Sequence, residues 1–152
     1  MELDWVQFFS LSTVSAIFAF CLNQLLAWFE RRKRIKAASL LLLHEVNRHV
    51  YWLEQLNNGN NSPVELMNLL PDIEWEKLKY DMFHIGYEKF DILVEHYLEM
   101  ESIRFLSRKI EDKGHRRIPK QRIQKHLDIA KRAHLLLFNL SGKNSTKFSK
   151  MQ

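Results

Sequence analysis

The sequence is poor in residues that break helices and in residues that cross-link chains. Its 152 residues include four glycines, three prolines and one cysteine, Cys21. A single cysteine cannot form an intrachain disulfide, so the composition gives no reason to expect an oxidising compartment. No glycine or proline interrupts residues 5–58. A helix that starts in this stretch therefore meets no strong stop signal before the polar loop expected at 57–63.

The sequence also lacks the motifs of common enzymes. It has no G-x-S-x-G nucleophile elbow and no P-loop, and its glycines are too scattered to wrap a phosphate. Only paired carboxylates such as Glu74 and Glu76 keep an enzymatic alternative open. We therefore expect a protein that is not an enzyme, with no catalytic residues and no cofactor.

A metal-binding motif is approached but not met. Residues 44–49, HEVNRH, resemble the zinc-binding HExxH motif with one residue too many. Five helical positions turn the chain by about 500°, so the imidazoles of His44 and His49 point apart instead of converging on one ion. The sequence therefore predicts no metal site, and it predicts that Glu45 supports Arg48 or His49 on a solvated helix face.

Charge is missing from residues 5–29. A helix of this length spans ~37 Å, against a hydrocarbon core of about 30 Å. Trp5 stands at one end and Trp28 and Phe29 at the other, where aromatic belts form. We expect a single transmembrane helix here. A secretory signal peptide is one alternative, although it would carry its positive charge before the apolar region.

A buried core helix is the other alternative, because polar side chains dilute the apolar run. They are Gln7, Ser10, Ser12, Ser15, Asn23 and Gln24. Some of them belong to a stripe of small and polar residues with a spacing of four, three and four. The stripe consists of Ser12, Ala16, Ala19 and Asn23. Small residues let helix backbones approach closely in lipid, and asparagine gains from a partner amide, so the stripe predicts a homo-oligomer. Alternatively, such residues are simply common in membrane helices.

A basic collar follows directly, within residues 30–36. Its members are Arg31, Arg32, Lys33, Arg34 and Lys36. The preceding residues 1–4 contain two acidic residues and no basic one. The positive-inside rule therefore puts residues 1–4 outside and everything after residue 30 in the cytoplasm. We expect the bacterial inner membrane as the location, with the collar attracted to lipid headgroups.

Residues 37–141 predict an all-α cytosolic domain, followed by a disordered basic tail at 142–152. The first of its helices has an apolar face made of Leu43, Val46, Val50 and Leu53. Further helices are expected at 64–70 and from the N-cap Asp72 to Gly86. Another is expected to continue from there to Lys113, and a last one to begin at Pro119. Before Lys113, the expected apolar stripe is Phe90, Leu93, Val94, Tyr97, Leu98, Phe105, Leu106 and Ile110.

Charge is distributed in blocks along this domain. Residues 37–103 hold four basic and twelve acidic residues, whereas residues 104–132 hold eleven basic and three acidic ones. Such asymmetry indicates an anionic partner for the later segment, or attraction between the blocks in an oligomer. Arginine suits bidentate phosphate contacts, and histidine can stack on a base. The residues expected to contact a ligand are Arg104, Arg108, Arg116, Arg117, Lys120, Arg122, Lys125 and His126. The alternative is a basic face that is solvated, or pressed against lipid or against the acidic block.

The layout resembles the small membrane effectors of type III CRISPR defence, which join one N-terminal membrane helix to a small helical domain that binds cyclic tetra-adenylate. The resemblance covers the whole chain and is carried by residues 5–29, the collar and the basic segment 104–132. It implies an antiphage effector. In such a protein, a cyclic oligoadenylate would bind across subunits, reorder the membrane helices and disrupt the inner membrane.

Two other functions stay open. A membrane-tethered interaction protein, such as a phage exclusion factor or an adaptor, would dock a protein through the apolar faces and the acidic block. A membrane-bound nucleic-acid binder would show steep salt dependence, but long nucleic acid is not expected at a membrane. The expected partners are membrane lipid, further copies of this chain and a cyclic oligoadenylate.

Overall fold

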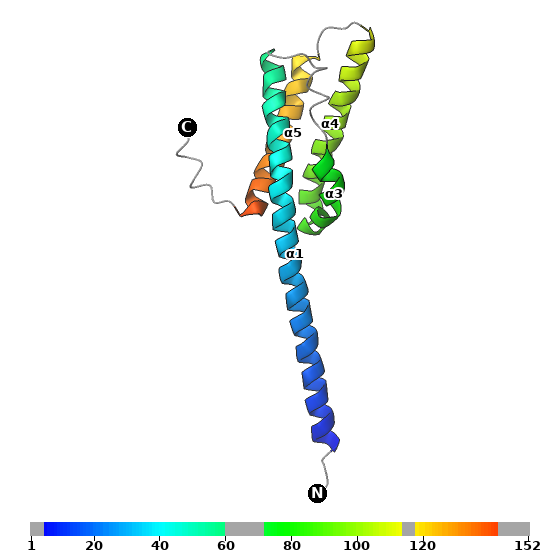
Figure 1. Ribbon diagram of the computed structural model, residues 1–152, viewed down its shortest axis with the longest axis vertical. Coiled ribbons are helices and arrows are strands. Elements are labelled where there is room, and N and C mark those ends of the chain that lie inside the picture. The colour runs from blue at the N-terminus through cyan, green and yellow to red at the C-terminus, as the bar shows by residue number, and fades with distance from the viewer. Residues whose placement is uncertain (1–4, 60–71, 114–117, 143–152) are drawn as a thin grey trace, which may run out of the picture. The chain divides into compact units, whose positions relative to one another are not determined.

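The computed structural model describes residues 5–59, 72–113 and 118–142, with side chains from residue 13 onward and without those of 110–113. Over these ranges the chain is all-α, as predicted, and holds no strand. The elements are α1 (Trp5–Asn58), α3 (Ile73–Met82), the 3-10 helix η1 (Phe83–Ile85), α4 (Tyr87–Lys113) and α5 (Lys120–Ser141), as Figure 1 shows. The helix predicted at 64–70 and the tail beyond Gly142 lie outside the described residues.

Helix α1 is continuous, as its lack of glycine and proline predicts. The chain divides after Arg34 into two compact units, and α1 contributes to both. In the first unit the large apolar side chains from residue 14 to residue 29 are all exposed, from 46% for Trp28 to 69% for Phe18. By length and composition this helix is sufficient to cross a membrane, a test that a signal sequence near an N-terminus also passes.

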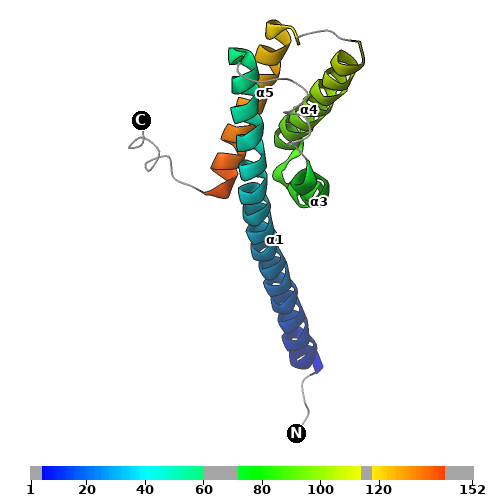
Figure 2. The ribbon, with the colours of Figure 1, turned by 45° about the horizontal axis from the view of Figure 1, so that its top comes forward.

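The second unit, Ile35–Gln152, contains the later part of α1 together with α3, η1, α4 and α5. Figures 1 and 2 show α4 and α5 alongside the later half of α1, α4 in the same direction and α5 in the opposite one. One buried cluster joins all four α-helices: Ala38, Leu42, Leu43, Val46, Trp75, Met82, Leu93, Tyr97, Ala133 and Leu137. A second joins the C-terminal part of α1 to α4 and α5: Leu53, Leu56, Met100, Ile103, Ile118, Ile123, Leu127 and Ala130.

The predicted apolar face of α1 is confirmed, since Leu43, Val46 and Leu53 are buried and Val50 is partly buried. The stripe predicted on α4 is only partly right. Leu93 and Tyr97 are buried, but Leu98 and Phe105 are 61% and 57% exposed. The buried face of α4 instead includes polar positions, which apolarity alone could not identify. They are His96 and Ser107, whose hydroxyl donates to the Ile103 carbonyl.

The helix ends follow the sequence signals with one exception. Gly59, directly after α1, has a φ of 76°, and Gly142 closes α5 in the left-handed region. Pro119 precedes the first residue of α5, where its missing N–H costs nothing. Asp72 does occupy the N-cap position of α3, but its carboxylate makes no capping bond. The predicted N-cap position is thus confirmed, but the carboxylate is held by Arg104 and does not cap the helix.

Candidate functional site

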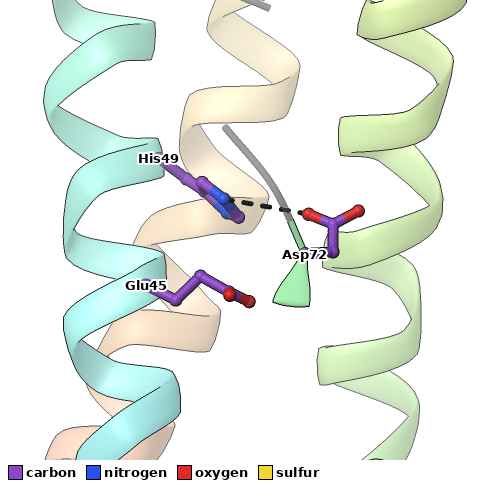
Figure 3. A group of neighbouring side chains, drawn as sticks. All are labelled: Glu45, His49 and Asp72. Atoms are coloured by element: carbon purple, nitrogen blue, oxygen red, sulfur yellow. Dashed lines mark ion pairs between the residues drawn. The ribbon is translucent and has the colours of Figure 1, made fainter. Parts of the chain in front are cut away.

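A group of buried and partly buried polar side chains lies between α1, the start of α3 and α4. We call it the polar cluster, and its members are Glu45, His49, Asp72, His96, Tyr97 and Arg104. Glu45 and His49 lie one turn apart on α1 and are 6% and 1% exposed. In Figure 3 their side chains and that of Asp72 point toward one space. Elements far apart in sequence therefore bring these polar groups together.

His49 has one satisfied and one unsatisfied ring nitrogen. Its Nδ1 lies 3.0 Å from Nε2 of His96. Its Nε2 lies 3.9 Å from an Asp72 oxygen, too far for a hydrogen bond, and has no partner among the described residues. Burial lowers the pKa of His49 well below 6.5, and burial with the nearby Arg104 charge lowers the pKa of His96 to about 3. Both rings are therefore neutral near pH 7.

Glu45 links three helices. Its Oε1 accepts the Tyr97 hydroxyl at 2.7 Å and its Oε2 accepts the backbone N–H of Glu74 at 3.0 Å. Burial raises the pKa of Glu45, and these hydrogen bonds oppose the rise. Burial and the Glu45 carboxylate likewise raise the pKa of Tyr97, whose ring stacks on Trp75 at 4.4 Å between centroids. Glu45 is thus a structural acceptor for groups on α3 and α4.

The solvated face predicted for Glu45 and His49 is therefore wrong, because α3 and α4 cover it. The divergence predicted for the two histidines is confirmed, since His44 is exposed and His49 is buried. The signal available in the sequence was the four-residue spacing of Glu45 and His49, which puts both on one face. No spacing rule points to Asp72, which is separated from α1 in the sequence by residues 60–71, outside the described ranges.

Many basic residues of the segment 104–132 are paired with acids of the 37–103 block. The guanidinium of Arg104 donates two hydrogen bonds to Asp72. Lys125 pairs with Glu99, Lys131 with Glu54 and Arg132 with Glu95, each at 3.0 Å. The two charge blocks therefore attract each other within one chain. This arrangement matches the alternative in which basic side chains are pressed against the acidic block.

His126 is the one histidine among the predicted ligand contacts. It is 2% exposed, and its Nδ1 lies 2.8 Å from Glu99, although the ring is not oriented for a hydrogen bond. Burial lowers its pKa, an effect that Glu99 opposes and that Arg122 and Lys125 reinforce. Its side chain is thus part of the α4–α5 packing, and a ligand would reach it only by displacing neighbours.

Three other predicted contacts are exposed and make no ion pair with described residues: Arg108, Lys120 and Arg122. Arg108 lies near the end of α4, and the other two lie in the first turn of α5. Arg116 and Arg117, also predicted, lie outside the described residues. A shallow groove between α4 and α5 has Arg122 and Lys125 on one wall. Glu95 and Glu99 line its other wall.

The predicted membrane-side residues are exposed wherever their side chains are described. This holds for Ala16, Ala19 and Asn23 of the stripe and for all five collar residues. The side chain of Ser12 lies outside the described residues. The Arg32 guanidinium stands 4.5 Å from the centre of the Trp28 ring, a cation–π contact between the collar and the end of the apolar run.

Comparison with known proteins finds no relative of this chain. No protein-family model, curated protein or solved structure matches this chain. The likeness in layout to CRISPR membrane effectors stays a prediction, and a function has to be argued from the residues of this chain.

Proposed function

We propose that this chain is a single-pass membrane protein whose helical domain lies in the cytoplasm and binds a small anionic ligand. The observation that carries the membrane assignment is the apolar helix with large side chains exposed from residue 14 to residue 29. Exposed apolar surface of this extent is rare on soluble monomers and needs a partner such as lipid. A self-contained core in the following unit supports a separate aqueous domain.

The orientation follows from the collar. Five exposed basic residues come directly after the apolar helix, and the residues before it are acidic. Moving such a cluster across a membrane is costly, so the domain after residue 35 belongs in the cytoplasm of a bacterial cell, with the membrane being the inner one. Its collar then lies at the level of anionic headgroups.

The ligand site that we propose is the junction of α4 and α5. Arg108, Lys120 and Arg122 carry charge there that acidic residues of the described chain do not neutralise. The first turn of α5 adds backbone N–H groups that have no partner within the helix. Arg104 and Lys125 are less suited than predicted, because a ligand would have to break their ion pairs.

A cyclic oligoadenylate is the ligand that best fits this proposal. Such a ring presents several phosphates symmetrically, and a small basic junction repeated in an oligomer presents matching cations. Binding across subunits would change the spacing of the domains and hence the packing of the membrane helices. The resulting function is an antiphage membrane effector that disrupts the inner membrane.

Titration of the full-length protein in nanodiscs with cyclic tetra-adenylate, cyclic hexa-adenylate and a linear tetra-adenylate tests this assignment. Replacing Arg122 or Lys120 by alanine should weaken binding by at least about tenfold, since each removes a charged hydrogen bond to phosphate. Lys77→Ala, at an exposed lysine of α3, is the matched control. Absence of binding to every cyclic ligand, or equal affinity in all variants, would remove the proposal.

A second function is favoured by a different observation. Large apolar side chains at the α3–α4 corner are exposed: Tyr80 at 76%, Phe83 at 64% and Tyr87 at 81%. Aromatic side chains of this kind anchor protein interfaces, so a membrane-tethered adaptor would dock its partner here. Crosslinking in cells followed by purification should then recover one stoichiometric protein, and Phe83→Ser with Tyr87→Ser should lose it. An unchanged yield in the double variant would exclude this corner.

A further inference from the structure

The polar cluster contains an unsatisfied nitrogen that its protein neighbours do not explain. Nε2 of His49 is buried and has no hydrogen-bond partner among the described residues. Buried polar atoms are nearly always satisfied, so an orphan indicates a bound water, an ion or a special role. In Figure 3 a dashed line joins this nitrogen to an Asp72 carboxylate oxygen, which lies 3.9 Å away.

The tautomer of His49 sharpens this point. A 3.0 Å contact between two imidazole nitrogens requires that one of them donates a hydrogen and the other accepts it. If Nδ1 of His49 donates, the lone pair of its Nε2 faces the carboxylate of Asp72 with no hydrogen between them. Two electron-rich atoms then face each other in a buried space. A cation bound between them turns this repulsion into coordination.

We propose that Glu45, His49 and Asp72 form a binding site for a divalent transition-metal ion of the zinc class. One imidazole nitrogen and two carboxylates form a donor set that zinc accepts. The three donor atoms lie within 4.8 Å of one another. Metal–ligand bonds of about 2.0–2.2 Å put two ligands of a tetrahedral ion about 3.3–3.6 Å apart. His49 and Asp72 are 3.9 Å apart, and the widest separation would have to close by at most about 1.5 Å when the ion binds.

The neighbours of these three residues hold each ligand in the way that metal sites require. The far nitrogen of His49 is within hydrogen-bond distance of His96, Tyr97 donates to Glu45, and Arg104 donates to Asp72. Partners of this kind orient metal ligands and fix the histidine tautomer. A carboxylate oxygen accepts more than one bond, so these contacts leave lone pairs for the ion.

The two carboxylates of the site favour binding of a divalent cation, and the nearby guanidinium lowers the affinity for it. Glu45 and Asp72 balance the two charges of the ion, whereas Arg104 adds one positive charge beside it. Three protein ligands leave one tetrahedral position for water. An ion here would join α1 to the residue that starts α3, and so fix the corner between them. This role is independent of any ligand at the α4–α5 junction.

Titration of the full-length, chelator-treated protein in detergent with ZnCl2 tests the site. We expect one zinc ion per chain and a higher melting temperature with zinc. His49→Gln and Glu45→Gln should each weaken zinc binding by at least about tenfold. His44→Gln and His84→Gln, at exposed histidines of the same domain, should leave binding unchanged. Equal affinity in His49→Gln and the natural chain, or no binding by the natural chain, would overturn the proposal.

A cobalt titration keeps the test decisive if a variant fails to fold, which its circular dichroism would reveal. The natural chain with CoCl2 should give the intense visible bands of tetrahedral cobalt, and added zinc should abolish them. A weak octahedral spectrum, like that of the ion in water, would contradict a site formed by three protein ligands.

Discussion

Arg104 on α4 holds Asp72, the residue before α3, by two parallel hydrogen bonds, and both side chains are largely shielded from water. The pair links the later part of the chain to a segment thirty-two residues earlier. It also explains why the N-cap position of α3 lacks its usual side-chain bond. The same arginine, which the sequence offers to a ligand, is used to position a helix.

Removing Arg104 should therefore destabilise the domain. Arg104→Ala leaves the Asp72 carboxylate unpaired in a shielded place, and we expect the free energy of unfolding to fall by about 3 kcal/mol. Arg104→Lys keeps the charge but loses the bidentate contact, so its loss of stability should lie between zero and that of Arg104→Ala. Urea unfolding followed by circular dichroism measures both. Arg108→Ala, one turn further along α4 and exposed, should change stability by less than about 0.5 kcal/mol. Equal effects at the two positions would mean that the Asp72 pair contributes nothing.

The leucines of α1 provide a matched test of the core. Leu42 is fully buried, whereas Leu41 beside it is 50% exposed. Leu42→Ala should lower the free energy of unfolding by about 2–5 kcal/mol, because it leaves a cavity among four helices. Leu41→Ala should cost less than about 1 kcal/mol. Two equal losses would place α1 in a different rotation about its axis.

His126 should make the domain less stable in acid. Burial depresses its folded-state pKa below 6.5, its ordinary value, against the opposing charge of Glu99. Above pH 6.5 the ring is neutral in both states and adds no pH dependence. Below pH 6.5, the unfolded chain takes up a proton that the folded chain resists. The free energy of unfolding therefore decreases as the pH decreases.

Urea unfolding between about pH 5 and 7 measures this slope. His126→Gln should reduce the slope but not abolish it, because the buried His49 and His96 contribute in the same direction. His84→Gln, at an exposed histidine, should leave it unchanged. The charged groups around His126 are Glu99 on α4 and Arg122 and Lys125 on α5, with His96 nearby. Stability that rises toward acid in the natural chain would mean that Glu99 keeps the ring protonated.

Helix positions were largely predictable because their signals are local. The uninterrupted run to residue 58, Pro119 before α5 and the glycine after α5 each act on the backbone within a few residues. The apolar face of α1 was equally clear, because its leucines and valines recur at helical spacing. The inward face of α4 was not, because it includes the polar residues His96, whose partner His49 lies on α1, and Ser107, whose hydroxyl bonds to the Ile103 carbonyl one turn earlier.

The candidate sites were less predictable because burial decides their chemistry. The charge of Arg104 is visible in the sequence, but its ion pair with Asp72 depends on how α3 and α4 pack. Glu45 and His49 looked like surface residues, since nothing local indicates that α3 covers them. Pairing between the charge blocks was open to several interpretations, and only the fold assigns Lys125 and Arg132 to acids of the same chain.

The collar should set the orientation in the membrane. Replacing its five basic residues by glutamine removes the positive-inside signal and should leave a mixture of orientations. In a Cys21→Ala background, single cysteines at positions 2 and 152 report the two sides through an impermeant maleimide on intact cells. With the natural collar, position 2 should react and position 152 should not. Labelling of neither position, together with extraction by alkaline carbonate, would contradict a membrane span.

The small-residue stripe should control assembly. Leucine in place of Ala16 and Ala19 would hold helix backbones apart, and Asn23→Leu removes an amide that can pair across an interface. Because polar contacts between membrane helices are worth about 0.6–2 kcal/mol, Asn23→Leu should weaken association by roughly 3- to 30-fold. Light scattering of the detergent-solubilised protein measures the mass. Ile17→Leu and Phe20→Leu, off the stripe, are the matched controls. A monomer in the natural chain, or one mass in every variant, would show that the stripe is not an assembly face.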